Sequence, residues 1–263
     1  MKKVLAIVLA LVLTAAVALA SAETLVVGAT AVPHAEILEQ AKPILAAKGV
    51  DLEIVVFDDY VQPNRQLADG DLDANYFQHV PYLTGFNASN NTNLAVLGAV
   101  HYEPMGIYGG KTAALDAIKA GAVIGIPNDP SNEVRALELL AALDLIVLPE
   151  VYDTTLTVLD ITGDLNPLKL ELIEIAAEQL PRQLADFDFA VINSNYALEA
   201  GVEVVGTALA CESTEVSYPN VVAIREGDTN PLLQTLIDVL QSDEIANWIT
   251  ETYGTAVVPT TVY

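Results

Sequence analysis

Short apolar runs rich in β-branched residues alternate with helix-like stretches along nearly the whole chain. The runs predicted as strands cover residues 24–28, 52–57, 72–77, 94–102, 122–126, 170–175, 189–192 and 221–225. Helical patterns cover residues 35–48, 62–68, 131–143, 231–241 and 244–252, and Pro43 is expected to kink the first of these helices. Strands that alternate with helices predict an α/β fold with largely parallel sheets.

These elements are more numerous than one small sheet accommodates, which predicts two lobes. The glycine-rich stretch 106–110 (GIYGG) is a candidate crossing between the lobes, and a second crossing is expected between residues 206 and 218. The first lobe would then be discontinuous, formed by residues 23–107 and 208–263, with residues 108–207 inserted as the second lobe. This arrangement predicts a ligand cleft between the lobes, faced by strand ends and helix N-termini.

Residues 1–22 have the pattern of a secretory signal peptide. A basic start (KK) is followed by the apolar run 4–20 and by the small-residue site ASA at 20–22. A transmembrane anchor is the alternative, because the run is close to the shortest that crosses a bilayer. We expect export with cleavage near Ala22, and the apolar run does not end in a cysteine that could carry a lipid anchor.

Composition narrows the functional classes. The chain is 52% hydrophobic, enough for a folded core, and its formal net charge is −24. Such an acidic surface repels phosphates, so nucleic-acid binding is excluded. Cys211 is the one cysteine, so no internal disulfide can form, and we expect it to be a half-buried core residue rather than a nucleophile.

Residues 126–135 (IPNDPSNEVR) place a polar turn between a predicted strand and a predicted helix. Asp129 or Ser131 can cap this helix, and free N–H groups at its start would attract a carboxylate. Asn132 and Arg135 lie three residues apart and therefore share one helix face. Arg135 can grip a carboxylate through two parallel hydrogen bonds, or it can pair with one of the many acidic side chains.

Aromatic side chains gather in residues 73–82 (DANYFQHVPY). These rings, together with Tyr60 upstream, can wall a pocket that suits an apolar side chain and in particular a thioether sulfur; they are Tyr76, Phe77, His79 and Tyr82. The alternative is that these rings belong to the core.

Residues 191–196 (VINSNY) end a predicted strand with two asparagines. Asn193 and Asn195 offer acceptors for an ammonium group and donors for a carboxylate, although asparagine is also common in turns. Nucleophile elbows, phosphate loops and dinucleotide motifs do not occur in the sequence. Their absence is negative evidence only, and the expectation of a binding protein without cofactor, rather than an enzyme, rests on the family resemblance described below.

The three histidines raise an alternative function. His34, His79 and His101 each lie near a predicted strand end and could converge on a metal ion, with Asp58 or Asp59 as a further ligand. Their spacing matches no known metal motif, so the metal-receptor hypothesis ranks second. An exported hydrolase built on the same lobes ranks third.

Six segments carry a family resemblance. They are 27–39 (VGATAVPHAEILE), 59–64 (DYVQPN), 70–83 (GDLDANYFQHVPYL), 101–108 (HYEPMGIY), 126–132 (IPNDPSN) and 191–197 (VINSNYA). In order and spacing they resemble the methionine-binding lipoprotein family, the NlpA type, of bacterial ABC importers. DANYFQH and IPNDPSN are specific to that family, and the segments span most of the chain beyond residue 22.

The resemblance implies a two-lobed periplasmic-binding-protein fold, type II-like, that closes around L-methionine or a close relative and then docks on a membrane permease. It implies that aromatic rings hold the thioether and that the Asn and Arg after the NDP turn hold the carboxylate, with the arginine as the only cation in the cleft. The implied ligand residues are Tyr60, Phe77, His79, Tyr82, His101, Asn132, Arg135, Asn193 and Asn220. We expect a monomer, and the missing lipid-anchor cysteine and the high acidity are the two departures from the family pattern.

Overall fold

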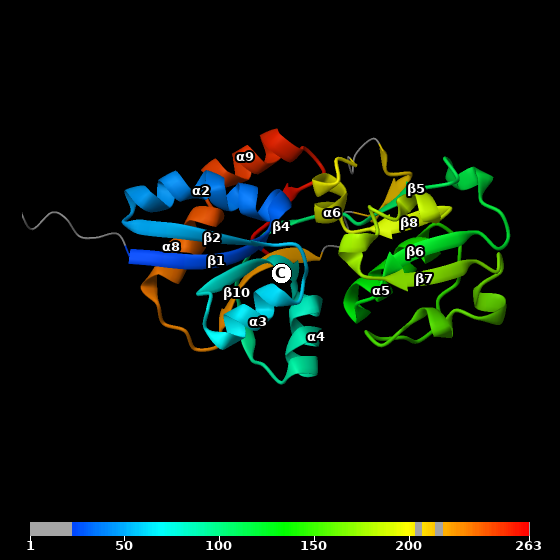
Figure 1. Cartoon of the computed structure of the whole chain (residues 1–263), viewed down its shortest axis with the longest axis horizontal. Helices are drawn as coiled ribbons and strands as arrows, with labels where there is room; N and C mark the ends of the chain where they lie inside the picture. The colour runs from blue at the N-terminus through cyan, green and yellow to red at the C-terminus, as the bar shows by residue number, and fades with distance from the viewer. Residues whose placement is uncertain (1–22, 203–206, 214–217, 263) are drawn as a thin grey trace, which may run out of the picture.

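The structure, a computed structural model, describes residues 23–202, 207–213 and 218–262, and these form two α/β lobes side by side (Figure 1). The first lobe contains a six-stranded sheet in the order β11-β4-β10-β3-β1-β2, and the second a five-stranded sheet in the order β7-β6-β8-β5-β9. The predicted two-lobed α/β fold is thus confirmed. The expected signal segment, residues 1–22, lies outside the described residues.

The first lobe combines the beginning and the end of the chain. Its strands are β1 (Glu23–Thr30), β2 (Val50–Phe57), β3 (Ala74–His79), β4 (Leu94–Tyr102), β10 (Pro219–Arg225) and β11 (Val258–Pro259). Its helices are α2 (Glu36–Ala47), α3 (Gln62–Asp69), α4 (Val80–Asn90), α8 (Pro231–Leu240) and α9 (Asp243–Tyr253), and the short π-helix η1 (Ala31–Ala35) leads into α2. Pro43 lies inside α2, which is assigned as one continuous helix.

The sheet of the first lobe is mixed, whereas the sequence pattern predicted largely parallel pairing. β1 is parallel to β2 and β3, but β10 is antiparallel to both β3 and β4. The reason is topological, because β10 is the strand on which the chain returns from the second lobe. Strand periodicity does not reveal that direction.

Side-chain alternation along β1 explains how its sheet is covered on both faces. Leu25, Val27 and Ala29 point into a core shared with α2, α8 and α9, while Val26 packs on the opposite side near α3 and α4. Gly28 is needed there, since a Cβ would lie 2.6 Å from the Leu72 side chain. A strand with both faces buried reads in sequence as the continuous apolar run from which we predicted it.

The second lobe contains β5 (Gly106–Gly109), β6 (Val123–Pro127), β7 (Glu171–Ile175), β8 (Phe189–Ile192) and β9 (Ala210–Cys211), with α5 (Pro130–Ala142) and α6 (Ser194–Glu199). Short 3-10 turns and loops make up most of the remainder, residues 143–170 above all. β6 runs parallel to β7 and β8, and β5 runs antiparallel to β8 and β9.

The glycine-rich stretch expected to cross between the lobes is instead a strand within the second sheet. β5 pairs with β8 over Gly106–Gly109, and Gly110 passes directly against the backbone of Leu184 and Phe187. Glycine is required here for close packing rather than for a bend. β9 also belongs to this sheet, so we now propose that the second lobe begins with β5 and ends with β9 rather than at residues 108 and 207.

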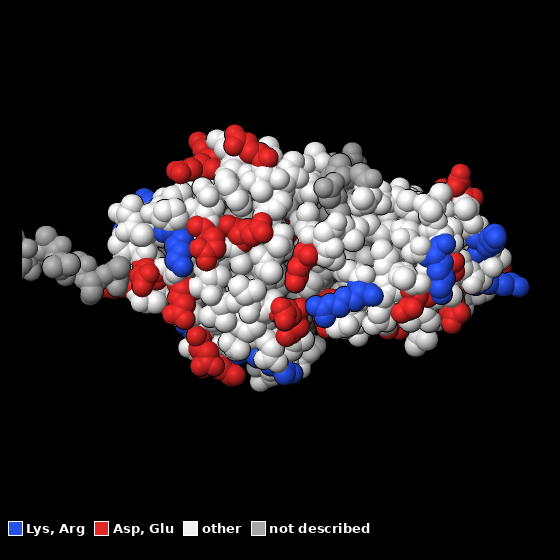
Figure 2. Space-filling view, turned by 45° about the horizontal axis from the view of Figure 1, so that its top comes forward, with Lys and Arg blue, Asp and Glu red and all other residues white. Residues whose placement is uncertain are grey.

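The acidity of the chain is spread over its surface. Figure 2 shows acidic side chains dispersed over the visible face of both lobes rather than gathered in one patch. Across the described residues, every helix is too short or too polar to span a membrane. Cys211 has intermediate exposure in β9, as its sequence context predicted.

Candidate functional site

One pocket at the junction of the lobes collects the candidate ligand residues. β3 and the chain before α3 reach it from the first lobe, and the N-terminal turns of α5 and α6 reach it from the second. Its lining consists of Tyr60, Phe77, Gln78, His79, Tyr82, Glu103, Asn132, Arg135, Asn193, Ser194, Asn195 and Asn220. Every ligand residue expected from the sequence is among these except His101.

Three rings form an apolar slot on the first-lobe side. The Tyr60 ring centroid lies 5.8 Å from that of Phe77 and 5.7 Å from that of Tyr82, and Phe77 and Tyr82 are 5.9 Å apart. The Tyr82 hydroxyl donates to the Tyr60 carbonyl at 2.9 Å, which fixes the two rings to each other. The three rings thus contact one another and all line the pocket, where they form an aromatic wall suited to an apolar side chain.

His79 and Asn132 connect the two lobes across the pocket. His79 is the N-cap of α4, where its Nδ1 accepts from the Tyr82 N–H, and its Nε2 lies 3.1 Å from Asn132 Oδ1. Burial lowers the pKa of His79 to about 3, with Arg135 adding to the effect, so the ring is neutral and Nε2 is the donor. Asn132 Oδ1 accepts a second hydrogen bond, of 2.9 Å, from Asn193. Asn132 thus holds the side chains of His79 and Asn193 in place.

The start of α5 is not an open anion site, contrary to one expectation from the sequence. Asp129 caps the helix by accepting from the Asn132 N–H at 3.0 Å, and both its oxygens also accept from Asn132 Nδ2. Its own carboxylate therefore takes the place that an external anion would occupy. The backbone N–H of Asn132 and one side of its amide nitrogen are thus used within the helix start.

Arg135 is paired within the protein, which the sequence left open. Its Nε and Nη2 donate to the two oxygens of Glu212, each at 2.6 Å, and Nη2 also donates to the Glu103 carbonyl. Both side chains are buried, with 5% and 7% of their surface exposed. Burial alone would lower the pKa of Arg135, but Glu212 outweighs it and raises the pKa overall. The cation is therefore already neutralised, and Nη1 is the donor left for a ligand.

Two buried amide groups in the pocket have no hydrogen-bond partner among the described residues. They are Asn193 Oδ1, an acceptor, and Asn195 Nδ2, a donor, in residues that are 5% and 4% exposed. An unpaired buried polar atom costs about 1–3 kcal/mol, so such atoms are rare away from functional sites. An acceptor and a donor in the lining of one pocket match a ligand that carries both a positive and a negative group.

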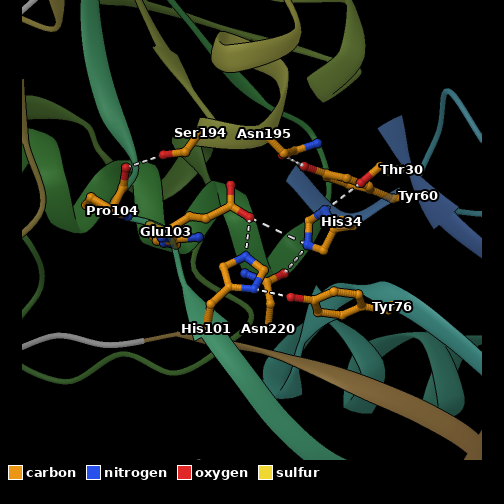
Figure 3. Close-up of polar contacts among 11 residues, drawn as sticks. Thr30, His34, Tyr60, Tyr76, His101, Glu103, Pro104, Ser194, Asn195 and Asn220 are labelled. Atoms are coloured by element: carbon orange, nitrogen blue, oxygen red, sulfur yellow. Dashed lines mark hydrogen bonds and ion pairs between the residues drawn. The ribbon is translucent and has the colours of Figure 1, made fainter. Parts of the chain in front are cut away.

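Glu103 is the pocket residue that sequence reasoning missed most clearly. It follows β4 in the crossing between the lobes, and its Oε1 lies 2.7 Å from His101 Nε2 (Figure 3). His101 itself is fully buried behind Glu103 and does not line the pocket. We expected His101 to contact the ligand, but the residue that lines the pocket at this point is Glu103, which His101 holds by a hydrogen bond. A lone acid in the apolar segment 101–108 was the available signal.

The metal-ion hypothesis required His34, His79 and His101 to converge, and the structure separates them. His79 binds Asn132, whereas His34 and His101 lie together with Glu103, their nearest ligating atoms within 4.8 Å. With its proton on Nε2, His34 donates to Asn220 Oδ1 at 3.2 Å, and His101 donates to Glu103. These groups satisfy one another by hydrogen bonding, so the predicted histidine trio is not a metal site.

Two α/β lobes with a polar and aromatic pocket between them are the architecture of a periplasmic substrate-binding protein. The matching family is the NlpA lipoprotein family, over residues 25–261, and the chain belongs to it. It is 37% identical over 241 residues to the methionine-binding lipoprotein MetQ of Bacillus subtilis, covering 89% of this chain and 87% of that protein.

Two solved structures are similar throughout. A nutrient-binding protein of Burkholderia cenocepacia bound to methionine has 38% identity and a TM-score of 0.86, covering 90% of this chain and 99% of that one. An ABC transporter periplasmic substrate-binding protein of Coxiella burnetii has 40% identity and a TM-score of 0.83, covering 90% and 100%. The names of these relatives place the family outside the cytoplasm.

Proposed function

We propose that this protein captures L-methionine, or a closely related amino acid, outside the cytoplasm and delivers it to the permease of an ABC transporter. The observation that carries the proposal is the pairing of an aromatic slot with unpartnered donor and acceptor groups in one interlobe pocket. The slot suits a thioether side chain, and the polar groups suit a zwitterion. One relative named as a methionine-binding lipoprotein and one solved structure bound to methionine support methionine as the ligand.

The proposed roles divide the pocket into two ends. Phe77, Tyr60 and Tyr82 surround the ligand side chain, while Arg135 Nη1 and Asn195 Nδ2 donate to its carboxylate. Asn193 Oδ1 and the Asn220 side chain are available to the ammonium end. His79 and Asn132 act by positioning, because His79 bonds Asn132 across the lobes and Asn132 also bonds Asp129 and Asn193 within the second lobe.

Hydrogen bonds between the two lobes link ligand capture to delivery of the ligand to the permease. Tyr60 of the first lobe donates to Asn195 of the second at 2.5 Å, and the Tyr196 hydroxyl donates to the Asp58 carbonyl at 3.1 Å. These contacts form only when the lobes meet, so ligand and closed form stabilise each other and the closed form can be recognised by a permease. One chain supplies the whole pocket, so we propose that the protein acts as a monomer. We also propose that its signal peptide is cleaved near Ala22 and that it is a carrier rather than an enzyme.

The proposal is tested by thermal unfolding. Protein freed of co-purified ligand by unfolding and refolding is heated with each amino acid in turn, including both enantiomers of methionine. At about a thousand times its dissociation constant, a true ligand adds about 4 kcal/mol to the free energy of unfolding. We expect this shift with methionine and none with zinc. If no amino acid raises the melting temperature, the proposal is wrong.

Asn195 offers a test of the carboxylate end. Replacing it with aspartate keeps an oxygen for the Tyr60 hydroxyl but turns the unpartnered donor into a negative acceptor. Methionine affinity should fall by about 1.5–3 kcal/mol, the range for a hydrogen bond to a charged group. Titration calorimetry measures the change, and Asn195→Ser should lose less because it adds no charge. Equal affinity of Asn195→Asp and the parent would remove Asn195 from the site.

A further inference from the structure

Glu103 is a buried carboxylate with one oxygen engaged and the other directed to the pocket. Oε1 is 2.7 Å from His101 Nε2 and 3.5 Å from His34 Nε2, and 6% of the side chain is exposed. In Figure 3 the second oxygen carries no contact to the other side chains drawn and points toward the start of α6, where Ser194 and Asn195 lie. The carboxylate therefore lines the pocket, and the group that approaches it from the α6 side is the Asn195 N–H.

The two histidines behind Glu103 are held as neutral donors. His34 Nδ1 lies 2.8 Å from the Thr30 hydroxyl, and His101 Nδ1 is bonded to the Tyr76 hydroxyl, which leaves each Nε2 facing oxygen. Burial lowers the pKa of His34 to about 4 and that of His101 to about 3. Both rings are uncharged near neutrality, so neither supplies a positive charge to Glu103.

Burial also disfavours the ionised form of Glu103. It raises the pKa of the Glu103 carboxyl to about 7, although His34, Arg135 and the Asn195 N–H each act in the opposite direction. Because the three buried groups are coupled, the proton belongs to the Glu103–His34–His101 cluster rather than to one side chain. The cluster gains one proton on passing from alkaline to acidic solution through neutrality.

The surroundings leave this carboxylate without a cation of its own. Among the described residues, the titratable groups outside the cluster that interact with Glu103 are Tyr60, Tyr76 of β3, Arg135 of α5 and Tyr253 of α9. Burial raises the pKa of the tyrosines, so they are neutral. Arg135 is matched by Glu212. A positive group entering the pocket would complete the charge balance.

We propose that Glu103 receives the ammonium group of the bound amino acid, and that capture expels the proton held by the Glu103–His34–His101 cluster. This inference rests on the proposed function and names the group that selects an α-amine. The ligand binds the carboxylate form, Asn193 Oδ1 accepts a second ammonium hydrogen, and the displaced proton goes to solvent. Acid solution returns the proton and so opposes capture.

The sign of the pH dependence follows directly. Just above neutrality, where the ligand amine is still protonated, Glu103 is ionised before the ligand arrives, and affinity changes little with pH. Below it, the ligand must displace a proton, so affinity falls by about tenfold for each pH unit well below 7. Calorimetry of the parent protein, at about pH 5.5 to 8.5 in two buffers of different ionisation enthalpy, should show release of about one proton per methionine at the acidic end.

An analogue without the amine isolates the interaction. 4-(Methylsulfanyl)butanoate keeps the thioether and the carboxylate, so its binding to the parent protein should release no proton. This comparison needs no variant. Proton release that is equal for methionine and for the analogue would overturn the inference.

Glu103→Gln provides the second arm. It should bind methionine about 10- to 100-fold more weakly at alkaline pH, since a charge-assisted hydrogen bond is lost, and its affinity should not vary with pH. The matched control is Glu133→Gln on α5, because burial raises the pKa of Glu133 also to about 7 but this side chain does not line the pocket. That variant should keep the parent's pH profile.

The outcomes separate the two proposals. If the parent binds methionine but Glu103→Gln keeps both its affinity and its pH profile, the inference on Glu103 fails and the proposed function stands. If the parent binds methionine at no pH, the proposed function itself fails.

Discussion

Arg135→Ala is expected to abolish methionine binding and also to lower the free energy of unfolding by about 3–5 kcal/mol. The first effect follows from the loss of Nη1, the donor available to the ligand carboxylate. The second follows because the buried Glu212 would lose both its 2.6 Å hydrogen bonds from Arg135. The sequence left open whether Arg135 binds a ligand or pairs with an acidic side chain, and the structure shows the pairing with Glu212. Calorimetry and denaturant unfolding measure the two effects separately.

A double variant distinguishes them. Arg135→Met combined with Glu212→Gln removes both charges and should recover most of the stability, because neutral replacement of a buried ion pair is often tolerated. It should not recover binding. Arg225→Ala is the matched control, since Arg225 pairs with Asp228 outside the pocket and its loss should leave affinity unchanged. Normal methionine affinity in Arg135→Ala would show that the carboxylate binds elsewhere.

Phe77→Ala is expected to weaken methionine binding by about 1–3 kcal/mol, the range for a lost apolar contact. Phe77 is 3% exposed and sits between Tyr60 and Tyr82, so its removal widens the slot on one side. Phe86→Ala is the matched control, because Phe86 is buried in the neighbouring core and does not line the pocket. It should cost stability without changing affinity.

Comparing methionine with norleucine tests the contribution of the ligand sulfur in the same binding experiment. Norleucine replaces the thioether sulfur with a methylene and should bind the parent less tightly by about 0.3–1.5 kcal/mol, the range for a sulfur–aromatic contact. In Phe77→Ala the difference in affinity between methionine and norleucine should be smaller. If Phe77→Ala bound both ligands as tightly as the parent does, the slot would not be the side-chain site.

Local pattern in the sequence was sufficient for most of the elements. The continuous apolar run of β1 and the helical period of α5 follow from how each element is buried, and Asp129 as the cap of α5 follows from short-range chemistry. The aromatic residues of 73–82 were recognisable because they stand together in the chain. Element boundaries moved by a few residues, and β5 was misread because glycine marks close packing as well as bends.

Residues that act through distant partners needed the tertiary structure. Glu212 lies 77 positions from Arg135, and Asn220 lies 186 positions from His34, so no local pattern indicates either contact. The ionisation of Glu103 depends on its burial behind the pocket, which a sequence does not state.

By itself, then, the sequence determined the α/β class, the segments that reach the cleft and the family resemblance, because these depend on neighbours along the chain. Only the tertiary structure decided which donors and acceptors of Arg135, Asn132 and Glu103 remain for a ligand. Hydrogen-bonding capacity is consumed by whichever groups meet in space, and those groups come from both lobes.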